Sequence, residues 1–294
     1  MIDAAPACAP PDFAPRKPRL AFPQNACDCH AHILGPVSMF AYAANRVYTP
    51  TDCLLQSYRD MLATLGVSRA VLVQPSVYGS DNEILMRALV EGGPAYRGVA
   101  VVDWDIEFAA LEKMHAAGVR GVRVNIVDVK EDKGALPMEQ LKALATSVAA
   151  LGWHMEFLLH ADQFPCLDEY LADFPVEVVF GHLGYMSTGR GLDEPGFQAL
   201  LRLLKRGRSW VKLTGPYRIS TATMPHSDVT QFAHALLATA PDQIVWGTDW
   251  PHVTVKGAMP NDGDIADLLS VWIPDENLRQ KVLVDNPARL YGFE

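Results

Sequence analysis

The chain contains 294 residues, of which 49% are hydrophobic and 20% are charged, a balance typical of a globular protein. Its 34 acidic and 25 basic side chains give a net charge of -9, so we expect no nucleic-acid partner. The sequence contains no run of about 18 apolar residues, so no membrane span is predicted. The five cysteines are scattered and show no paired metal-binding spacing, which favours a reducing cytoplasm.

Residues 1–23 form a proline-rich arm. Five prolines between residues 6 and 18 exclude a regular helix or a central strand there. No apolar stretch follows a basic start, so we do not interpret the arm as a signal peptide. We expect it to precede one domain over residues 24–294, and it could pack on a neighbouring subunit of a homo-oligomer.

From residue 25 onward, short β-branched runs alternate with longer amphipathic ones. The expected strands are 25–33, 70–74, 96–102, 119–125, 153–160, 176–181, 210–214 and 244–247. The expected helices are 52–65, 81–91, 108–117, 138–151, 163–172, 197–205, 229–240 and 265–272. Asn286-Pro287 starts a short closing helix, which Gly292 ends.

Eight strands alternating with eight helices predict an α/β fold made of parallel βαβ units, which we interpret as a single (β/α)8 TIM-type barrel. A doubly wound open sheet is the alternative, because alternation alone does not require closure. No GxGxxG follows the first strand, so the main sequence support for a dinucleotide-binding sheet is missing.

Unusual polar residues stand at the carboxyl ends of three expected strands. His30 and His32 lie on the first strand, where alternation places both side chains on one face. His182 ends the sixth strand and Asp249 follows the eighth. Because strand ends converge at the mouth of a barrel, these four residues could hold a metal, or polarise a carbonyl beside a carboxylate base.

The motifs around these residues resemble those of the amidohydrolase superfamily, and more narrowly its 2-pyrone-4,6-dicarboxylate lactonase-like branch. The resemblance runs from about residue 22 to the end of the chain. It is carried by Asp28-Cys29-His30-Ala31-His32, Gly181-His182, Gly247-Thr248-Asp249-Trp250-Pro251-His252 and Asn286-Pro287-Ala288-Arg289-Leu290-Tyr291.

The resemblance implies hydrolysis of a small carboxylate-bearing lactone, 2-pyrone-dicarboxylate-like or muconolactone-like, in aromatic compound degradation and without a bound metal. Asp249 would then be the general base for water, and His30, His32 and His182 would polarise the lactone carbonyl. Arg123 and Arg218 would bind a substrate carboxylate. The remaining pocket residues implied by the resemblance are Ser76, Tyr78, Asn82, Lys130, Tyr185 and His252.

Two departures from the branch pattern affect the expected substrate. Tyr185 stands where an arginine is expected shortly after His182, and only Lys130 replaces a further arginine after Arg123. With fewer basic groups, a lactone with one carboxylate, or with a carboxylate and a neutral or sulfonate group, fits better than the pyrone dicarboxylate.

Several alternatives remain open at this point. The same residues could serve a lactone isomerase acting on a sugar-acid lactone, or a zinc-dependent decarboxylase of the superfamily. Metal-using relatives place a histidine at the end of the fifth strand, where this chain has His160. No cofactor is favoured, but a zinc ion, if bound, would be held by His30, His32, His182 and Asp249, with His160 as a further candidate ligand. A non-enzymatic binding protein is the remaining alternative.

Overall fold

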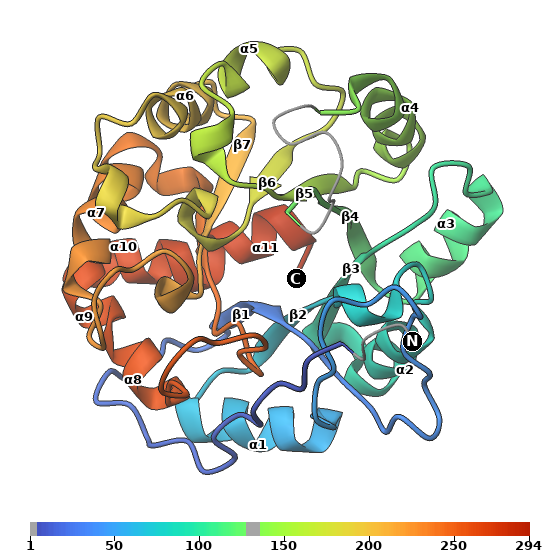
Figure 1. Cartoon of the computed structure of the whole chain (residues 1–294), viewed down its shortest axis with the longest axis horizontal. Coiled ribbons are helices and arrows are strands. Elements are labelled where there is room, and N and C mark those ends of the chain that lie inside the picture. The colour runs from blue at the N-terminus through green and yellow to red at the C-terminus, as the bar shows by residue number, and fades with distance from the viewer. Residues whose placement is uncertain (1–4, 128–135) are drawn as a thin grey trace.

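The computed structural model describes residues 5–127 and 136–294. Eight parallel strands form one sheet in the order β1 to β8, and helices surround it (Figure 1). This arrangement confirms the (β/α)8 barrel. The strands are β1 (Cys27–Ala31), β2 (Arg69–Val73), β3 (Tyr96–Ala100), β4 (Val119–Asn125), β5 (His154–Leu158), β6 (Val178–Phe180), β7 (Ser209–Leu213) and β8 (Ile244–Trp246).

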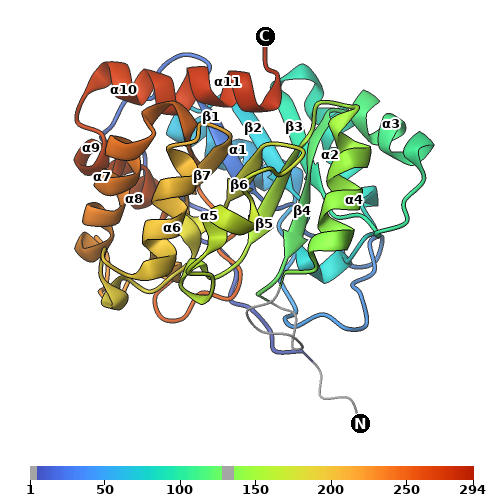
Figure 2. The ribbon, with the colours of Figure 1, turned by 90° about the horizontal axis from the view of Figure 1, so that it is seen from above.

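A helix follows each strand, and further helices end the chain. They are α1 (Leu55–Leu65), α2 (Glu83–Gly92), α3 (Phe108–Ala116), α4 (Met138–Ala149), α5 (Leu167–Tyr170), α6 (Pro195–Leu204), α7 (Thr230–Thr239), α8 (Asp262–Asp267), α9 (Leu269–Trp272), α10 (Glu276–Gln280) and α11 (Asn286–Tyr291). Figure 2 shows α10 and α11 lying across one end of the barrel. Tyr291 of α11 packs with Cys27 and Cys29, so this end is closed by apolar side chains.

The barrel is closed by backbone hydrogen bonds between β1 and the segment after β8. The Asp249 N–H donates to the His30 carbonyl at 2.9 Å, and the His32 N–H donates to the Trp250 carbonyl at 2.8 Å. The interpretation as an open doubly wound sheet is therefore wrong. These bonds form a seam between β1 and the turn after β8. Three of its four residues, His30, His32 and Asp249, belong to the predicted site.

Two of the expected helices form differently, and α10 was not predicted. The helix expected at 163–172 is reduced to α5, preceded by a 3-10 turn at 161–163, and the helix expected at 265–272 divides into α8 and α9. The closing helix α11 forms as expected, and Gly292 ends it in the left-handed conformation with φ 65°. Among the described helices, none is both long and apolar enough to cross a bilayer.

The proline-rich arm packs along its own chain. Near its start, Ala7 pairs with Thr49 as an isolated parallel bridge, and the Cys8 N–H donates to the Thr49 carbonyl at 2.8 Å. Farther along, Arg16 and Arg19 form ion pairs with Asp267 of α8 at 2.6 and 2.9 Å. The arm thus connects α8 to the loop after β1.

Candidate active site

A pocket opens at the mouth of the barrel, with a volume of about 490 Å³ when the part open to solvent is included. It brings together residues from the ends of several strands, as barrel geometry requires. Its lining is His32, Val47, Tyr48, Ser76, Arg123, Asn125, Val127, Leu158, His182, Tyr185, Arg218, Val253 and Thr254. Of the predicted site residues, the pocket therefore exposes two histidines, both arginines, Ser76 and Tyr185.

Asp249 is fixed beneath this pocket by the turn that follows β8. Gly247 lets the turn approach β1 closely, because a Cβ at this position would lie 2.6 Å from the backbone nitrogen of His30. Thr248 then donates its N–H and its hydroxyl to the buried Asp28 carboxyl, at 2.9 and 2.6 Å. Asp249 itself has φ 68°, a conformation that its surroundings must stabilise.

The two carboxyl oxygens of Asp249 have different surroundings. Oδ2 accepts hydrogen bonds from the Tyr217 hydroxyl and the Arg218 Nε, both at 2.6 Å. Oδ1 is buried, has no hydrogen-bond partner, and lies 3.7 Å from the His30 Nε2. Burial favours the neutral acid, but the charge and the hydrogen bond of Arg218 outweigh it and hold the Asp249 pKa well below its usual value. The result is an ionised carboxylate with one oxygen available.

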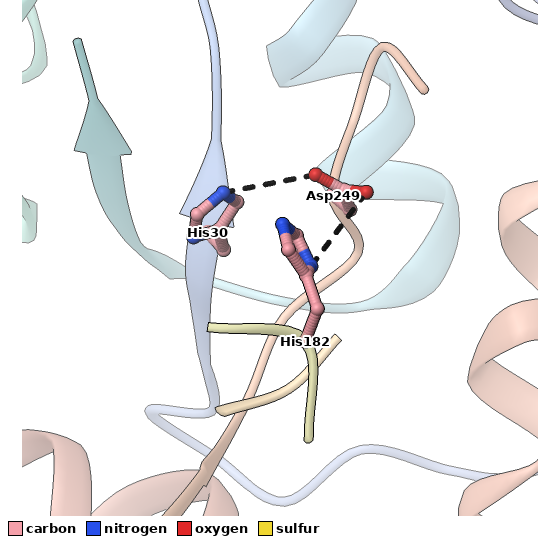
Figure 3. Close-up of side chains that lie close together, drawn as sticks. All are labelled: His30, His182 and Asp249. Carbon is pink, nitrogen blue, oxygen red and sulfur yellow. Dashed lines mark ion pairs between the residues drawn. The ribbon is translucent and has the colours of Figure 1, made fainter. Parts of the chain in front are cut away.

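Three neutral imidazoles lie around this carboxylate, and Figure 3 shows His30 and His182 directed toward it. The His182 Nδ1 lies 4.0 Å from the Asp249 Oδ2 and 2.9 Å from the Thr214 hydroxyl. The His30 and His32 rings meet edge-on with centroids 5.0 Å apart. Burial lowers the pKa of all three histidines, so none carries a charge near neutral pH.

Basic side chains lie on the pocket wall. The Arg123 Nη1 donates to the Gln74 carbonyl at 3.1 Å, while its Nε is buried without a partner. The Arg218 Nη2 donates to the Val253 carbonyl at 3.2 Å in addition to the bond with Asp249. Both guanidinium groups are thus held in place before any ligand arrives, which suits them to recognise an anion.

Some predicted residues do not line the pocket. The Tyr78 hydroxyl accepts from the Gly35 N–H, and the Asn82 amide donates to the Val101 carbonyl, so both hold loops in place. His252 lies behind Tyr217, with Nδ1 3.0 Å from its hydroxyl and Nε2 3.0 Å from Asp262. Lys130 lies outside the described residues.

His160 also lies away from the carboxylate. Its Nδ1 is 2.6 Å from the Tyr185 carbonyl, and its ring stacks on that of Tyr185 with centroids 4.6 Å apart. This contact supports the rim of the pocket beside His182.

Four contributing residues were missed by the motif-based prediction. Tyr48 lines the pocket from the loop after β1, and burial raises its pKa to about 12. Tyr217 bonds to Asp249, and Lys212 and Glu156 lie beneath His30. Alternation along β5 and β7 could have placed the last two inside the barrel, since a buried charge in a strand is unusual.

No cofactor was favoured from the sequence, and a zinc ion held by these residues was an alternative. Among the described residues, ligand atoms of His30, His182 and Asp249 lie within 4.8 Å of one another, and two imidazoles with a carboxylate form a donor set that zinc accepts. The charges around them do not fit. Arg218 bonds to Asp249 at 2.6 Å, and the Lys212 ammonium lies 3.3 Å from the His30 Nδ1. Both cations oppose a divalent ion at this place.

A family model described as amidohydrolase matches residues 27–293. The chain belongs to the amidohydrolase family. This amidohydrolase is 36% identical over 289 residues to 2-pyrone-4,6-dicarboxylate hydrolase of Comamonas testosteroni, covering 95% of this chain and 94% of that protein. It is 36% identical over 298 residues to 4-sulfomuconolactone hydrolase of Rhizobium radiobacter, covering 99% of each. To D-galactarolactone isomerase of Agrobacterium fabrum it is 32% identical over 284 residues, covering 93% of each.

A solved structure agrees with this assignment. A putative 2-pyrone-4,6-dicarboxylic acid hydrolase of Pseudomonas putida superposes on this amidohydrolase with a TM-score of 0.81 at 32% identity, covering 93% of this chain and 99% of that one. The amidohydrolase fold therefore extends over nearly the whole chain, including the strand ends that carry the pocket.

Proposed function

We propose that this amidohydrolase opens a small carboxylate-bearing lactone with a water molecule activated by Asp249. The observation that carries the proposal is the asymmetry of this carboxylate. Oδ2 is held by Tyr217 and Arg218, whereas Oδ1 is buried, unpartnered and directed toward His30. An ionised oxygen in this position is suited to accept a proton from water.

In the proposed reaction, Oδ1 takes a proton from water while the water oxygen attacks the lactone carbonyl. The carbonyl oxygen becomes an oxyanion, and imidazole N–H groups at the base of the pocket stabilise it. When the ring C–O bond breaks, Asp249 returns its proton to the departing oxygen. One water is consumed, and the product is an open chain with a new carboxylic acid, which ionises to a carboxylate and releases one proton.

The substrate anion would be bound by the pocket wall. Arg123 and Arg218 are the cations that line the described part of the pocket, and Ser76 and Tyr48 add hydroxyl groups beside them. Val47, Leu158 and Val253 supply apolar surface on other sides. This lining favours a muconolactone-like substrate with one carboxylate and a less polar remainder. The two relatives named as lactone hydrolases support the substrate class.

A direct test uses Asp249→Asn. Asparagine tolerates the left-handed backbone at this position and is nearly isosteric, so the fold should be kept while the base is lost. We expect kcat for a muconolactone-like substrate to fall roughly 10²- to 10⁴-fold, the usual contribution of a positioned base. Full turnover by this variant would exclude the mechanism.

A lactone isomerase is the second candidate, because a relative 32% identical over 93% of this chain carries that name. Reaction in 18O-labelled water separates the two candidates. Hydrolysis places the label in the new carboxylate, whereas transfer of the acyl group between hydroxyls of the substrate leaves it unlabelled.

We also propose that the reaction uses no resident metal, because Arg218 and Lys212 already supply positive charge beside the base and His30. Metal analysis of the purified enzyme, paired with turnover after chelator treatment, tests this. Near-stoichiometric zinc whose removal abolishes turnover would contradict the proposal and favour the zinc-dependent alternative.

A further inference from the structure

A buried ion pair lies inside the barrel directly beneath His30. The Lys212 Nζ on β7 is 2.6 Å from the Glu156 Oε2 on β5, and both side chains are at most 2% exposed. Burying two charges is costly unless they serve each other or a neighbour. The neighbour they share is His30, whose Nδ1 lies 3.3 Å from the Lys212 Nζ and 3.4 Å from the Glu156 Oε1.

The Lys212 ammonium has three hydrogens to place and no lone pair to offer. Its Nζ meets the Glu156 carboxylate at 2.6 Å, the Cys29 carbonyl at 2.8 Å and the His30 Nδ1 at 3.3 Å. Burial favours neutral Glu156, but the charge of Lys212 outweighs it and holds the Glu156 pKa well below its usual value. The glutamate is therefore a carboxylate that forms an ion pair with this ammonium.

The contact between the Lys212 ammonium and His30 determines which ring nitrogen of His30 carries the proton. Two groups lie near this Nδ1: the Lys212 ammonium, which can only donate, and the Glu156 Oε1, which can only accept. Only the contact with Lys212 has hydrogen-bond geometry, so the Nδ1 accepts and does not carry a proton itself. Burial, assisted by the Lys212 charge, lowers the His30 pKa, so the ring holds a single proton. That proton is left on Nε2, a buried atom without a partner that faces the Asp249 Oδ1.

His32 is fixed in the opposite way. Its Nδ1 lies 2.7 Å from the Val73 carbonyl, and a carbonyl oxygen can only accept. Since burial also lowers the pKa of this ring, its one proton is on Nδ1, and its Nε2 carries a lone pair. Two histidines two residues apart thus present different groups to the active centre.

We propose that Lys212 is a positioning residue that fixes His30 with its proton on Nε2, which makes His30, rather than His32, the hydrogen-bond donor to the lactone oxyanion. Glu156 forms an ion pair with the Lys212 ammonium, and the Cys29 carbonyl also holds it in place. The identity of the acceptor rests on the proposed function, whereas the position of the proton does not. The same assignment explains why His30 offers no lone pair to a metal ion.

The tautomers can be measured by 15N NMR of protein labelled in histidine, with the signals assigned through His30→Gln and His32→Gln. We expect His30 to show a protonated, pyrrole-like Nε2 and a bare, pyridine-like Nδ1, and His32 to show the reverse. A His30 ring protonated on Nδ1 would overturn the proposal. This result is independent of whether any lactone is turned over.

Variants then test the role of Lys212. Lys212→Met alone leaves Glu156 as an uncompensated buried charge, so the double variant Lys212→Met with Glu156→Gln removes both charges together. Glu156→Gln alone is the matched control, since it leaves the ammonium facing His30. We expect the control to keep the His30 proton on Nε2 and the double variant to lose that preference. Circular dichroism and thermal unfolding check that both are folded.

Kinetics add a second measurement. Loss of one preorganised oxyanion donor reduces kcat on the order of 10²-fold, so we expect kcat of the double variant to fall by that order while KM changes little. A folded double variant that keeps both the Nε2 proton and the kcat of its Glu156→Gln parent would overturn the proposal. If the wild-type enzyme opens no lactone, the proposed function fails, and the NMR result still decides the role of Lys212.

Discussion

At the residue scale, loss of the Tyr217 hydroxyl should change the pKa of the proposed base, Asp249, while leaving its carboxylate in place. Its hydroxyl donates to the Asp249 Oδ2 and lies 3.0 Å from the His252 Nδ1. A hydrogen bond to the charged form stabilises the carboxylate, so Tyr217→Phe should raise the Asp249 pKa and move the acid limb of the kcat/KM–pH profile to higher pH. We expect kcat to fall about 10-fold, as for one hydrogen bond to a charged group.

The matched control is Tyr185→Phe. It removes a phenol hydroxyl from the pocket wall, and the structure shows no hydrogen bond between this hydroxyl and Asp249. Its acid limb should stay where it is in the wild type. An unshifted limb in Tyr217→Phe would mean that Arg218 alone sets the ionisation of the base.

The sequence was most informative about residues that stand in strand-end motifs. His30, His32, His182 and Asp249 were predicted together because strand ends converge, and the structure brings them together. The pairing of Arg218 with Asp249 could not be predicted, since the contact depends on the turn after β7. His252 was predicted to line the pocket from its place in the motif, yet φ 58° turns its backbone and the side chain lies behind Tyr217.

At the scale of elements, the turn after β8 depends on a buried carboxyl of β1. Asp28 accepts from Thr248, from the Tyr58 hydroxyl of α1 and from the His30 N–H. Burial raises the Asp28 pKa from its usual value of 3.8 to about 6, despite these donors. The folded protein therefore binds this proton more tightly than the unfolded chain does.

A raised carboxyl pKa gives stability that is present at low pH and is lost as the pH rises through the folded-state value. The free energy of unfolding of the wild type, relative to Asp28→Asn, should fall by about 2 kcal/mol between about pH 4 and pH 7. Urea unfolding at several pH values measures this difference. Asp173→Asn removes an exposed carboxyl and is the control. A difference independent of pH would show that Asp28 does not titrate in this window.

Helices and strands were predicted well where the hydrophobic periodicity was strong. They were predicted poorly where tertiary contacts determine the local backbone conformation. β4 matches its expected range, because its β-branched run is bounded by Gly118 and a polar end. β1 contains an irregularity in register between Asp28 and Ala31. In this stretch the Asp28 side chain bonds to Tyr58 of α1, and His30 faces Lys212. Regular alternation cannot reveal such an irregularity.

At the scale of the whole molecule, the arm connects the periphery to the pocket. Thr49, paired with residues 6–8 of the arm, directly follows Tyr48 of the pocket wall. Deletion of residues 1–23 should therefore raise KM more than it lowers kcat, and should lower Tm by roughly 5 °C. Steady-state kinetics and thermal unfolding measure both effects.

Asp267→Asn is the control for this deletion, because it weakens the arm only where Arg16 and Arg19 bind α8. It should lower Tm and leave KM nearly unchanged. An unchanged KM after the deletion would show that the loop after β1 holds Tyr48 without help from the arm.

The seam between β1 and the turn after β8 has a consequence for how such enzymes diversify. The bonds that close it come from the backbone of His30, His32, Asp249 and Trp250, not from their side chains. A substitution at His30 or Asp249 can therefore abolish or redirect chemistry while the ring of strands stays intact. Natural selection could exchange one reaction for another at this seam without first having to rebuild the scaffold.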